Sequence, residues 1–381
     1  MKLSLRSLVG GLAALGWLML AGCSSEGSNG SGGPACSDMS LGVCKIADAG
    51  VRHIALSTPG ANGLAVDPES GLVYVVINGE TGVWCGGSQR YPESLSIVDP
   101  AQSKESASVP TGPGPVWPLV DQKRKRVYVA ASGAAGTVVV HNPTSGAMDR
   151  SFTLGGRPHD MGLDVSGDLM LVSNTFDKSQ TYISLLNVNS GAVAANFQVP
   201  ELPHKIVVDE AGRTAYAVSL GKGEITVVNL ATGTKGATFS SGSIPQTSAM
   251  VFSPRRRLLY VGKTGGSTPS SGSTIVGVDV DSMSVKADVG TFTPAASTPT
   301  RPWGGFGLDD EGGLLYAAVA NSNLVVVVDL QTNKPLAVFE VDACPWAVAL
   351  DIPRGVGYVS SNGAAALTVF QLAKVKAALG R

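Results

Sequence analysis

Local catalytic and cofactor motifs are missing from this chain of 381 residues. It contains no G-x-S-x-G turn for a nucleophilic serine, no H-E-x-x-H zinc motif, no C-x-x-C-H haem motif and no glycine-rich phosphate loop. These absences exclude enzymes built on one such motif, but not enzymes whose active sites assemble from distant segments. Charge is also scarce, because charged residues make up 15% of the chain and the formal net charge is −1. No overall field would therefore attract nucleic acid or an anionic membrane.

Glycine and proline are abundant, at 48 and 22 residues, and hydrophobic residues make up 44% of the chain. The stretch 202–239 shows how these residues are used. Four short runs that contain β-branched residues are separated by turns with Gly, Asp or Pro, a pattern typical of a four-stranded antiparallel meander. One such sheet cannot bury both of its faces, so further copies of the unit are expected beside it.

The unit recurs seven times along the chain. Where no insertion intervenes, the copies are spaced by about 42 to 45 residues, the range of four-stranded propeller repeats. The position at the start of the first strand is occupied by Asn62, Trp117, His159, His204, Gln246, Trp303 and Trp346. The turn after this strand begins at Asp67, Asp121, Asp164, Asp209, Ser253, Asp309 and Asp351, and the second strand carries Tyr74, Tyr128, Leu171, Tyr216, Tyr260, Tyr316 and Tyr358. Because Asp and Tyr recur in most copies, we interpret them as turn-capping and packing residues without a chemical role.

The repeat resembles the YVTN-type repeat of YncE-like seven-bladed β-propellers over residues 51–372. The match is carried by the segments 171–174, 327–332 and 358–362. The resemblance implies an all-β fold of seven four-stranded antiparallel blades, and it implies little about function because propellers serve as enzymes, binders and scaffolds alike. We expect residues 51–58 to supply the fourth strand of the last blade and so to close the ring. Residues 373–381 then form a C-terminal tail, either a short helix or a frayed end.

Residues 1–22 are predicted to be a targeting segment. Its apolar run, residues 8–20, is too short to span a bilayer. The sequence Leu20-Ala21-Gly22-Cys23 resembles the bacterial lipobox, which implies cleavage before Cys23 and diacylglycerol on its thiol. An ordinary cleaved signal peptide is the alternative.

The segment that follows, residues 23–50, is expected to be a flexible tether rich in Ser and Gly, with a small cysteine loop at its end. The protein would then be held by lipid in a bacterial cell envelope. Ser24 after the lipidated cysteine favours the outer membrane, with the domain facing the periplasm or the surface.

Four cysteines remain besides Cys23, and they allow three disulfide connectivities. Cys36 and Cys44 are close in sequence, so we expect a local loop between them. In the propeller architecture, the loop that carries Cys85 and the segment that carries Cys344 share one face of the neighbouring blades 1 and 7. A Cys85–Cys344 bond would then fasten the seam between the first and last blades.

The starts of the first strands lie closest to the central channel of such a propeller, on the face that also carries the insertions 78–94, 264–273 and 291–300. The candidate ligand-binding residues there are Asn62, Trp117, Arg157, His159, His204, Gln246, Arg301, Trp303 and Trp346. Their indoles, imidazoles and guanidiniums suit a small ligand, a sugar or a peptide. The alternative is that they are amphipathic plugs that fill the channel mouth. No metal site is predicted, because His159 and His204 lack an obvious third protein ligand.

We therefore expect a binding or scaffolding module for an envelope protein, a peptide or a small ligand, and we assign no cofactor and no catalytic residue. The protein is expected to be a monomer without a nucleic-acid partner. A lactonase-like hydrolase or a quinoprotein-like oxidoreductase that uses the same channel mouth is the alternative. Two basic runs, 123–126 and 255–257, are interpreted as solvated turn residues.

Overall fold

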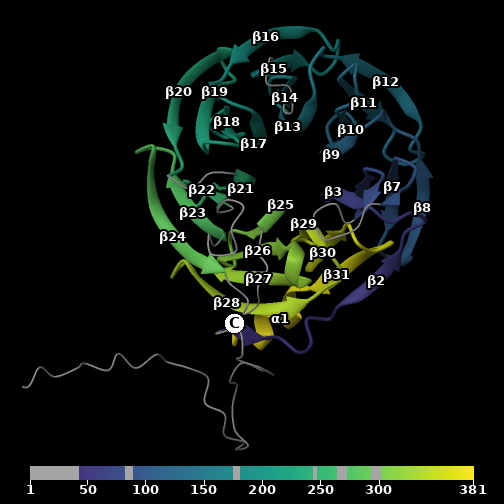
Figure 1. The fold of residues 1–381 in the computed structure, drawn as a ribbon, viewed down its shortest axis with the longest axis vertical. Coiled ribbons are helices and arrows are strands. Elements are labelled where there is room, and N and C mark those ends of the chain that lie inside the picture. The colour runs from purple at the N-terminus through teal and green to yellow at the C-terminus, as the bar shows by residue number, and fades with distance from the viewer. Residues whose placement is uncertain (1–42, 82–88, 175–180, 243–246, 264–272, 293–301) are drawn as a thin grey trace, which may run out of the picture.

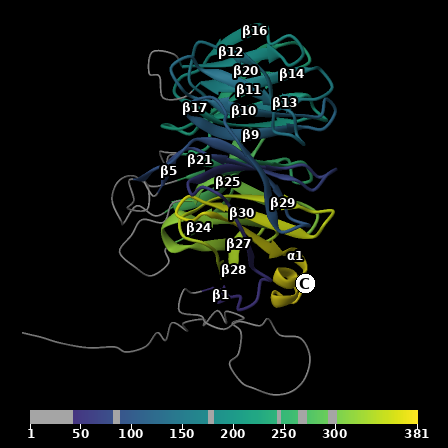
Figure 2. The same ribbon diagram turned by 90° about the vertical axis from the view of Figure 1, so that its right-hand side faces the viewer.

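Seven blades stand around a central axis in the computed structural model of this chain (Figure 1), and blades 6 and 7 are joined into one nine-stranded sheet by the pairing of Gly305 with Ala347. The structure describes residues 43–81, 89–174, 181–242, 247–263, 273–292 and 302–381. The first strand of each sheet lies nearest the axis and the last lies at the circumference, so the molecule is a disc (Figures 1 and 2). The predicted seven-bladed β-propeller is confirmed.

The first four blades follow one another in chain order. Blade 1 contains β3 (Ala61–Val66), β4 (Val73–Ile77), β7 (Ser94–Asp99) and β8 (Lys104–Val109), and the short strands β5 (Glu80–Thr81) and β6 (Gln89–Arg90) pair in its longest loop. Blade 2 contains β9 (Pro115–Asp121), β10 (Arg126–Ala131), β11 (Thr137–His141) and β12 (Met148–Thr153). Blade 3 contains β13 (Pro158–Asp164), β14 (Leu169–Asn174), β15 (Tyr182–Asn187) and β16 (Val193–Gln198). Blade 4 contains β17 (Pro203–Asp209), β18 (Thr214–Ser219), β19 (Glu224–Asn229) and β20 (Thr234–Ser240).

The last three blades complete the ring and take up both ends of the described chain. Blade 5 contains β21 (Thr247–Ser253), β22 (Leu258–Lys263), β23 (Ser273–Asp279) and β24 (Ser284–Phe292). Blade 6 contains β25 (Pro302–Asp309), β26 (Leu314–Val319), β27 (Leu324–Asp329) and β28 (Lys334–Glu340), with the 3-10 turn η1 (Ala320–Ser322) after β26. Blade 7 contains β29 (Pro345–Asp351), β30 (Val356–Ser361) and β31 (Ala366–Gln371), followed by α1 (Leu372–Ala378).

The recurring tyrosines are packing residues, as the repeat predicts. Tyr74, Tyr128, Tyr216, Tyr260, Tyr316 and Tyr358 are at most 4% exposed, and Leu171 is fully buried at the equivalent place. Tyr128 packs with Met161 and Met170 of blade 3, so its ring belongs to the seam between two blades. Second strands are mainly apolar because a neighbouring blade covers each of their faces.

The recurring aspartates cap the turn between the first and second strands. In blade 4, for example, the Asp209 carboxylate accepts a hydrogen bond of 3.1 Å from the backbone N–H of Gly212. The same bond recurs at Asp121, Asp164, Asp309 and Asp351. The residue four places after the aspartate has a positive φ, which is why glycine stands there at Gly71, Gly313 and Gly355.

Polar side chains on these turns also tie each blade to the next. Arg213 contacts Asp164 at 2.7 Å across the seam of blades 3 and 4, and Arg257 contacts Asp209 at 2.7 Å across the next seam. Equivalent turn contacts across four other seams are Gln122–Asp67, Arg124–Asp168, Arg256–Asp310 and Arg354 to the carbonyls of Pro68 and Glu69. Between blades 6 and 7, Lys376 of α1 pairs with Asp309 instead. The interpretation of the two basic runs as solvated residues is therefore wrong for their arginines 124, 256 and 257, which pair with carboxylates of neighbouring blades.

The N-terminal segment closes the ring as predicted. β2 (Arg52–Ala55) pairs antiparallel with β31, with Ile54 opposite Leu367, and so supplies the fourth strand of blade 7. Ile54 is 1% exposed and packs among residues of blades 1 and 7. The seam between the first and last blades is therefore made by both ends of the chain.

The segment just before β2 is more ordered than the expected tether over 23–50. β1 (Cys44–Lys45) pairs in parallel with β28, which makes it a fifth strand on blade 6. The link to β2 then crosses from blade 6 to blade 7. Because β1 and β2 pair with different blades, the N-terminal segment bridges two of them.

The C-terminal residues are a helix that packs on blade 6. Leu372, Val375 and Ala378 of α1 are buried in the same cluster as Phe339 and Ile46. Two ion pairs, Lys376–Asp309 at 2.7 Å and Arg381–Asp329 at 2.9 Å, join this end to blade 6. Of the two forms that the sequence allowed for this tail, the structure shows the helix.

Two of the four cysteines expected in disulfides lie in the described part of the chain. Cys44 and Cys344 are both disulfide-bonded and almost fully buried. Cys36 and Cys85 lie outside the described residues, so the pairings Cys36–Cys44 and Cys85–Cys344 stay predictions.

Deleting residues 51–58 should abolish cooperative unfolding. The change exposes the edge of β31 and removes Ile54 from the seam, and an open sheet edge promotes aggregation. Chemical unfolding followed by fluorescence, with light scattering for aggregation, measures the effect. An unchanged unfolding midpoint would show that the ring does not depend on this strand.

Two point variants of β2 provide a matched comparison. Ile54→Ala should cost about 2–5 kcal/mol, as for other buried isoleucines. His53→Ala changes the residue directly before Ile54. The His53 side chain is 50% exposed and paired with Asp342, so this variant should lose less than about 1 kcal/mol of stability. Equal losses in the two variants would contradict the buried seam.

Candidate functional site

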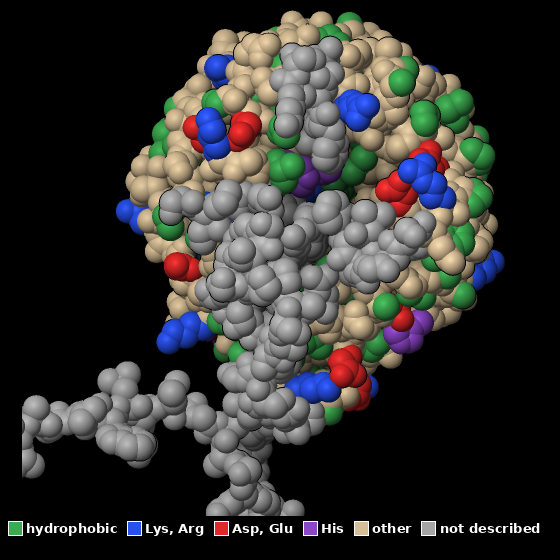
Figure 3. All heavy atoms as spheres, in the orientation of Figure 1, with side chains coloured by type: hydrophobic (Ala, Val, Ile, Leu, Met, Phe, Trp, Pro, Cys, Tyr) green, Lys and Arg blue, Asp and Glu red, His purple; other side chains and the backbone are tan. Residues whose placement is uncertain are grey.

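The channel mouth brings four of the predicted residues to the axis. Asn62, Trp117, His159 and His204 stand at or near the start of four inner strands and are 6–7% exposed. Histidine side chains are visible at the centre of the disc in Figure 3. Trp346 is half-buried and Arg157 is exposed. Gln246, Arg301 and the side chain of Trp303 lie outside the described part of the structure.

Trp117 fills space that glycines leave in other blades. A Cβ atom on Gly63 of blade 1 would lie 2.5 Å from the indole, and one on Gly305 of blade 6 would lie 3.4 Å from it. The indole of blade 2 therefore reaches from blade 1 to blade 6, where larger side chains would displace it. This geometry agrees with the alternative that Trp117 is a plug of the channel.

A buried lysine lies against this indole. The Lys205 ammonium is 3.2 Å from the centre of a Trp117 ring, well inside the range of a cation–π contact. The charged group that pairs with this ammonium is the Asp160 carboxylate, which is 3.6 Å away. Burial lowers the pKa of Lys205 to about 8, against the opposing effect of Asp160. Burial likewise raises the pKa of Asp160, against the effect of Lys205.

Two imidazoles stack beside this pair. The rings of His159 and His204 are 4.0 Å apart, and His159 Nδ1 is 3.3 Å from the backbone carbonyl of His204, to which it can donate a hydrogen bond. Burial, and next the charge of Lys205, lower the pKa of His159 to about 3. Burial, His159 and Lys205 together lower the pKa of His204 well below its usual value. Both histidines are therefore neutral at pH 7, and Lys205 is the cation nearest to them.

Two buried polar atoms of the mouth lack a hydrogen-bond partner. They are Nδ1 of His204 and Oδ1 of Asn62. A buried polar atom without a partner costs free energy that a bound molecule can recover. Together with Lys205 and Asp160, these atoms make a buried polar group at the channel mouth. We call Asn62, Trp117, His159, Asp160, His204 and Lys205 the mouth cluster.

Beyond the mouth cluster, the inner strands enclose a cavity of about 690 Å³ near the turns that follow the first strands. Its walls are mainly apolar and come from β9, β13, β17 and β21, with Leu119, Met161, Ile206, Val251 and Phe252 among them. Lys123 and Glu210 also line it. The two ends of the channel thus differ in chemistry: one end is polar and filled, and the other is apolar and hollow.

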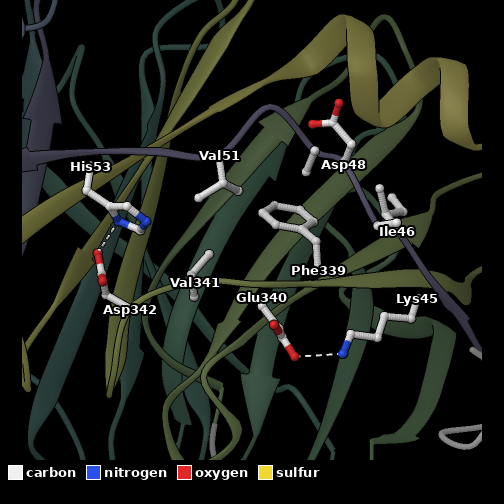
Figure 4. A pocket seen from close by; sticks show the side chains of 11 residues that line it. Lys45, Ile46, Asp48, Val51, His53, Phe339, Glu340, Val341 and Asp342 are labelled. Carbon is white, nitrogen blue, oxygen red and sulfur yellow. Dashed lines mark hydrogen bonds and ion pairs between the residues drawn. The ribbon is translucent and has the colours of Figure 1, made fainter. Parts of the chain in front are cut away.

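A second cavity, of about 620 Å³, lies at the circumference beneath the N-terminal segment (Figure 4). Its charged side chains are already paired. Lys45 contacts Glu340 at 2.6 Å and His53 contacts Asp342 at 2.8 Å, and both pairs join the N-terminal segment to the end of β28. This cavity belongs to the closure of the ring and not to the channel.

Sequence reasoning missed Lys205 and Asp160, although a signal for them exists. Lys205 directly follows His204, and Asp160 directly follows His159, so both stand one place after the aligned position at the start of the first strand. In other blades the same register carries Gly63, Pro118 and Ala347. A charged residue where the repeat otherwise has a small or apolar one marks a departure that the fold does not require.

Neither a metal-binding cluster nor a membrane-spanning helix occurs among the described residues. No group of three or more His, Cys, Asp or Glu side chains is arranged to hold a metal ion. Among the described helices, none combines the length and the hydrophobicity needed to cross a membrane.

Comparison with known proteins identifies the fold alone. No family model matches the sequence, and no curated protein matches it. A chain of hydrazine synthase from Kuenenia stuttgartiensis superposes with a TM-score of 0.69 at 14% identity, covering 84% of this chain and 97% of that chain. In all, 1554 chains of solved structures match, so the architecture is widespread and does not specify an activity. The chain is a β-propeller. This architecture supports a binding or scaffolding module in general.

Acidification should destabilise this propeller through its mouth histidines. Below pH 6.5 the unfolded chain binds protons at residues 159 and 204 that the folded protein excludes, because the folded pKa values are lowered. The free energy of unfolding is therefore highest above pH 6.5. As the pH falls below 6.5, each histidine lowers it by about 1.4 kcal/mol per pH unit until the pH reaches the folded pKa of that histidine. Urea unfolding at pH 7 and pH 5 measures the loss.

The control separates these histidines from other groups that titrate in the same range. The double variant His159→Gln/His204→Gln should lose most of the additional slope, whereas the exposed rim variant His53→Gln should keep it. Equal slopes in wild type and double variant would contradict the assignment of the neutral pair.

Proposed function

We propose that this propeller is a lipid-anchored binding protein of a bacterial cell envelope, and that it receives a small acidic ligand at the mouth cluster. The observation that carries the ligand class is the Lys205 ammonium, buried beside two neutral imidazoles, one of which, His204, has an Nδ1 without a partner. A carboxylate placed there gains a charge-assisted hydrogen bond from the ammonium. Imidazole N–H and amide N–H groups can donate to its second oxygen.

The size of the ligand follows from the packing of the mouth. Trp117 occupies the space beside Gly63 and Gly305, and the residues of the cluster are nearly buried. A large rigid molecule would have to displace the indole. The packing therefore favours a compact carboxylic acid, or the acidic end of a longer molecule, as the ligand of the mouth cluster.

The anchor rests on the sequence of the N-terminal segment, which lies outside the described residues. The first described residue is Val43, and β1 fixes the chain at the edge of blade 6. The described chain therefore begins at the circumference of the disc. The YncE-like assignment and the outer-membrane location belong to this proposal, and the lactonase-like or quinoprotein-like alternative uses the same mouth.

Ligand binding can be tested with glycolate, a small acid without a carbonyl group outside its carboxylate. We expect saturable binding by calorimetry that weakens as salt is raised, because a charge pair contributes to it. Lys205→Met should weaken binding by about tenfold to hundredfold, the loss of one charge-assisted hydrogen bond.

The matched control is Lys263→Met. Lys263 is also buried, and burial lowers its pKa to about 8, but its ammonium donates hydrogen bonds to the carbonyls of Ser241 and Gly242 in blade 5. This variant should keep the affinity for glycolate. If glycolate does not bind to the wild type, or binds equally to both variants, the mouth cluster is not the acid site.

The anchor has a separate test. Cys23→Ser removes the thiol that would carry diacylglycerol, and the Ser/Gly-rich tether offers no other membrane affinity. The variant should therefore move from the membrane fraction to the soluble periplasmic or secreted fraction. Retention in the membrane fraction after a high-salt wash would contradict lipid anchoring.

A further inference from the structure

Lys205 differs from an ordinary ion-paired lysine in its surroundings. One side of its ammonium faces the Trp117 indole at 3.2 Å, and the Asp160 carboxylate stands 3.6 Å away. That distance fits an ion pair and exceeds a normal hydrogen bond. The side chain is 7% exposed, so water competes little for the amine. A lysine in such a setting is less strongly held in its charged form than one in solvent.

The neighbouring groups provide what amine chemistry requires. Asp160 is close enough to exchange a proton with the Lys205 amine after a small adjustment. Its second oxygen accepts a hydrogen bond of 2.8 Å from the backbone N–H of Ile206, which fixes the carboxyl group. The Trp117 ring faces the amine nitrogen, where it can stabilise a positive charge on that atom.

We propose that Lys205 is a carbonyl-reactive amine, which forms a protonated imine with a small oxo acid bound at the mouth cluster. The Lys205 ammonium first gives one proton to Asp160. The free amine then attacks the carbonyl carbon of the oxo acid, and a C–N bond forms while the carbonyl oxygen becomes a hydroxyl group by taking a second proton from the nitrogen. Asp160 returns its proton to that hydroxyl, which leaves as water. The products are one water molecule and an iminium ion, and no oxidant or reductant is needed.

The charge distribution suits this product. The iminium ion carries the same positive charge as the ammonium that it replaces, so the contacts to Trp117 and Asp160 are kept. The carboxylate of the oxo acid can accept a hydrogen bond from an imidazole N–H of the cluster. This inference rests on the proposed acid site and adds a covalent step to it.

The amine is also in a favourable protonation state. Burial lowers the pKa of Lys205 to about 8, so about half of the side chains carry a free amine at pH 8. A lysine of ordinary pKa, near 10.4, carries well under about 1%. The rate of imine formation should therefore rise up to about pH 8 and then level off.

Glyoxylate with cyanoborohydride tests the proposal, because the reductant converts the imine into a stable carboxymethyl-lysine that peptide mass spectrometry can locate. At pH 8 we expect labelling of Lys205 at least about tenfold faster than of the exposed Lys222 or the buried Lys263. Lys205→Arg keeps the positive charge and has no primary amine, so it should lose this label. Asp160→Asn should slow labelling about tenfold or more, as for loss of a proton-transfer group.

The outcomes separate this proposal from the acid site itself. Excess glycolate should slow the labelling of Lys205 and leave that of Lys222 unchanged. If glycolate binds and Lys205 is labelled no faster than Lys263, the imine is overturned and the acid site stands. If glycolate does not bind and protects nothing, the acid site fails, and the imine proposal fails with it. Should Lys205→Arg not fold, the labelling rates of wild type and Asp160→Asn still decide the matter.

Discussion

The pairing of β2 with β31 is the contact on which the rest of the structure depends. Each blade buries its faces only against its two neighbours, so a ring with one open seam would expose the apolar faces of two blades. Polar contacts between the turns, such as Arg213–Asp164 and Arg257–Asp209, join neighbouring blades on a smaller scale. The strand pair closes the circle, and the turn contacts set the distance from blade to blade.

The architecture could be predicted from the sequence because it is repeated. A weak signal in one blade, such as one Asp or one Tyr, becomes reliable when seven copies agree on its position. The same averaging explains what was missed. Lys205, Asp160 and the strand β1 each occur once, so no other copy supports them, and the paired arginines 124 and 257 depend on the twist between blades, which no linear pattern contains.

The channel mouth shows how residues that depart from the repeat in separate blades come together in the fold. Gly63 and Gly305 are small where they face the axis, and Trp117 of a third blade fills the space that they leave. An alignment of the repeats does not reveal that Trp117 packs beside these two glycines, because each of the three residues differs from the repeat only in its own blade. In three dimensions the exceptions meet at one point, and that point is the mouth cluster.

Filling a channel does not require charge. Apolar side chains of similar volume would close the axis without the desolvation of an ammonium and a carboxylate, and buried ion pairs are often less stabilising than apolar replacements. Here the fold also keeps two histidines neutral against their usual pKa and leaves two polar atoms without partners. The buried ion pair, the two neutral histidines and two of the unpartnered polar atoms of the described structure lie together in one cluster at the axis. A cluster that lowers stability in several independent ways at one place is better explained by a ligand than by packing.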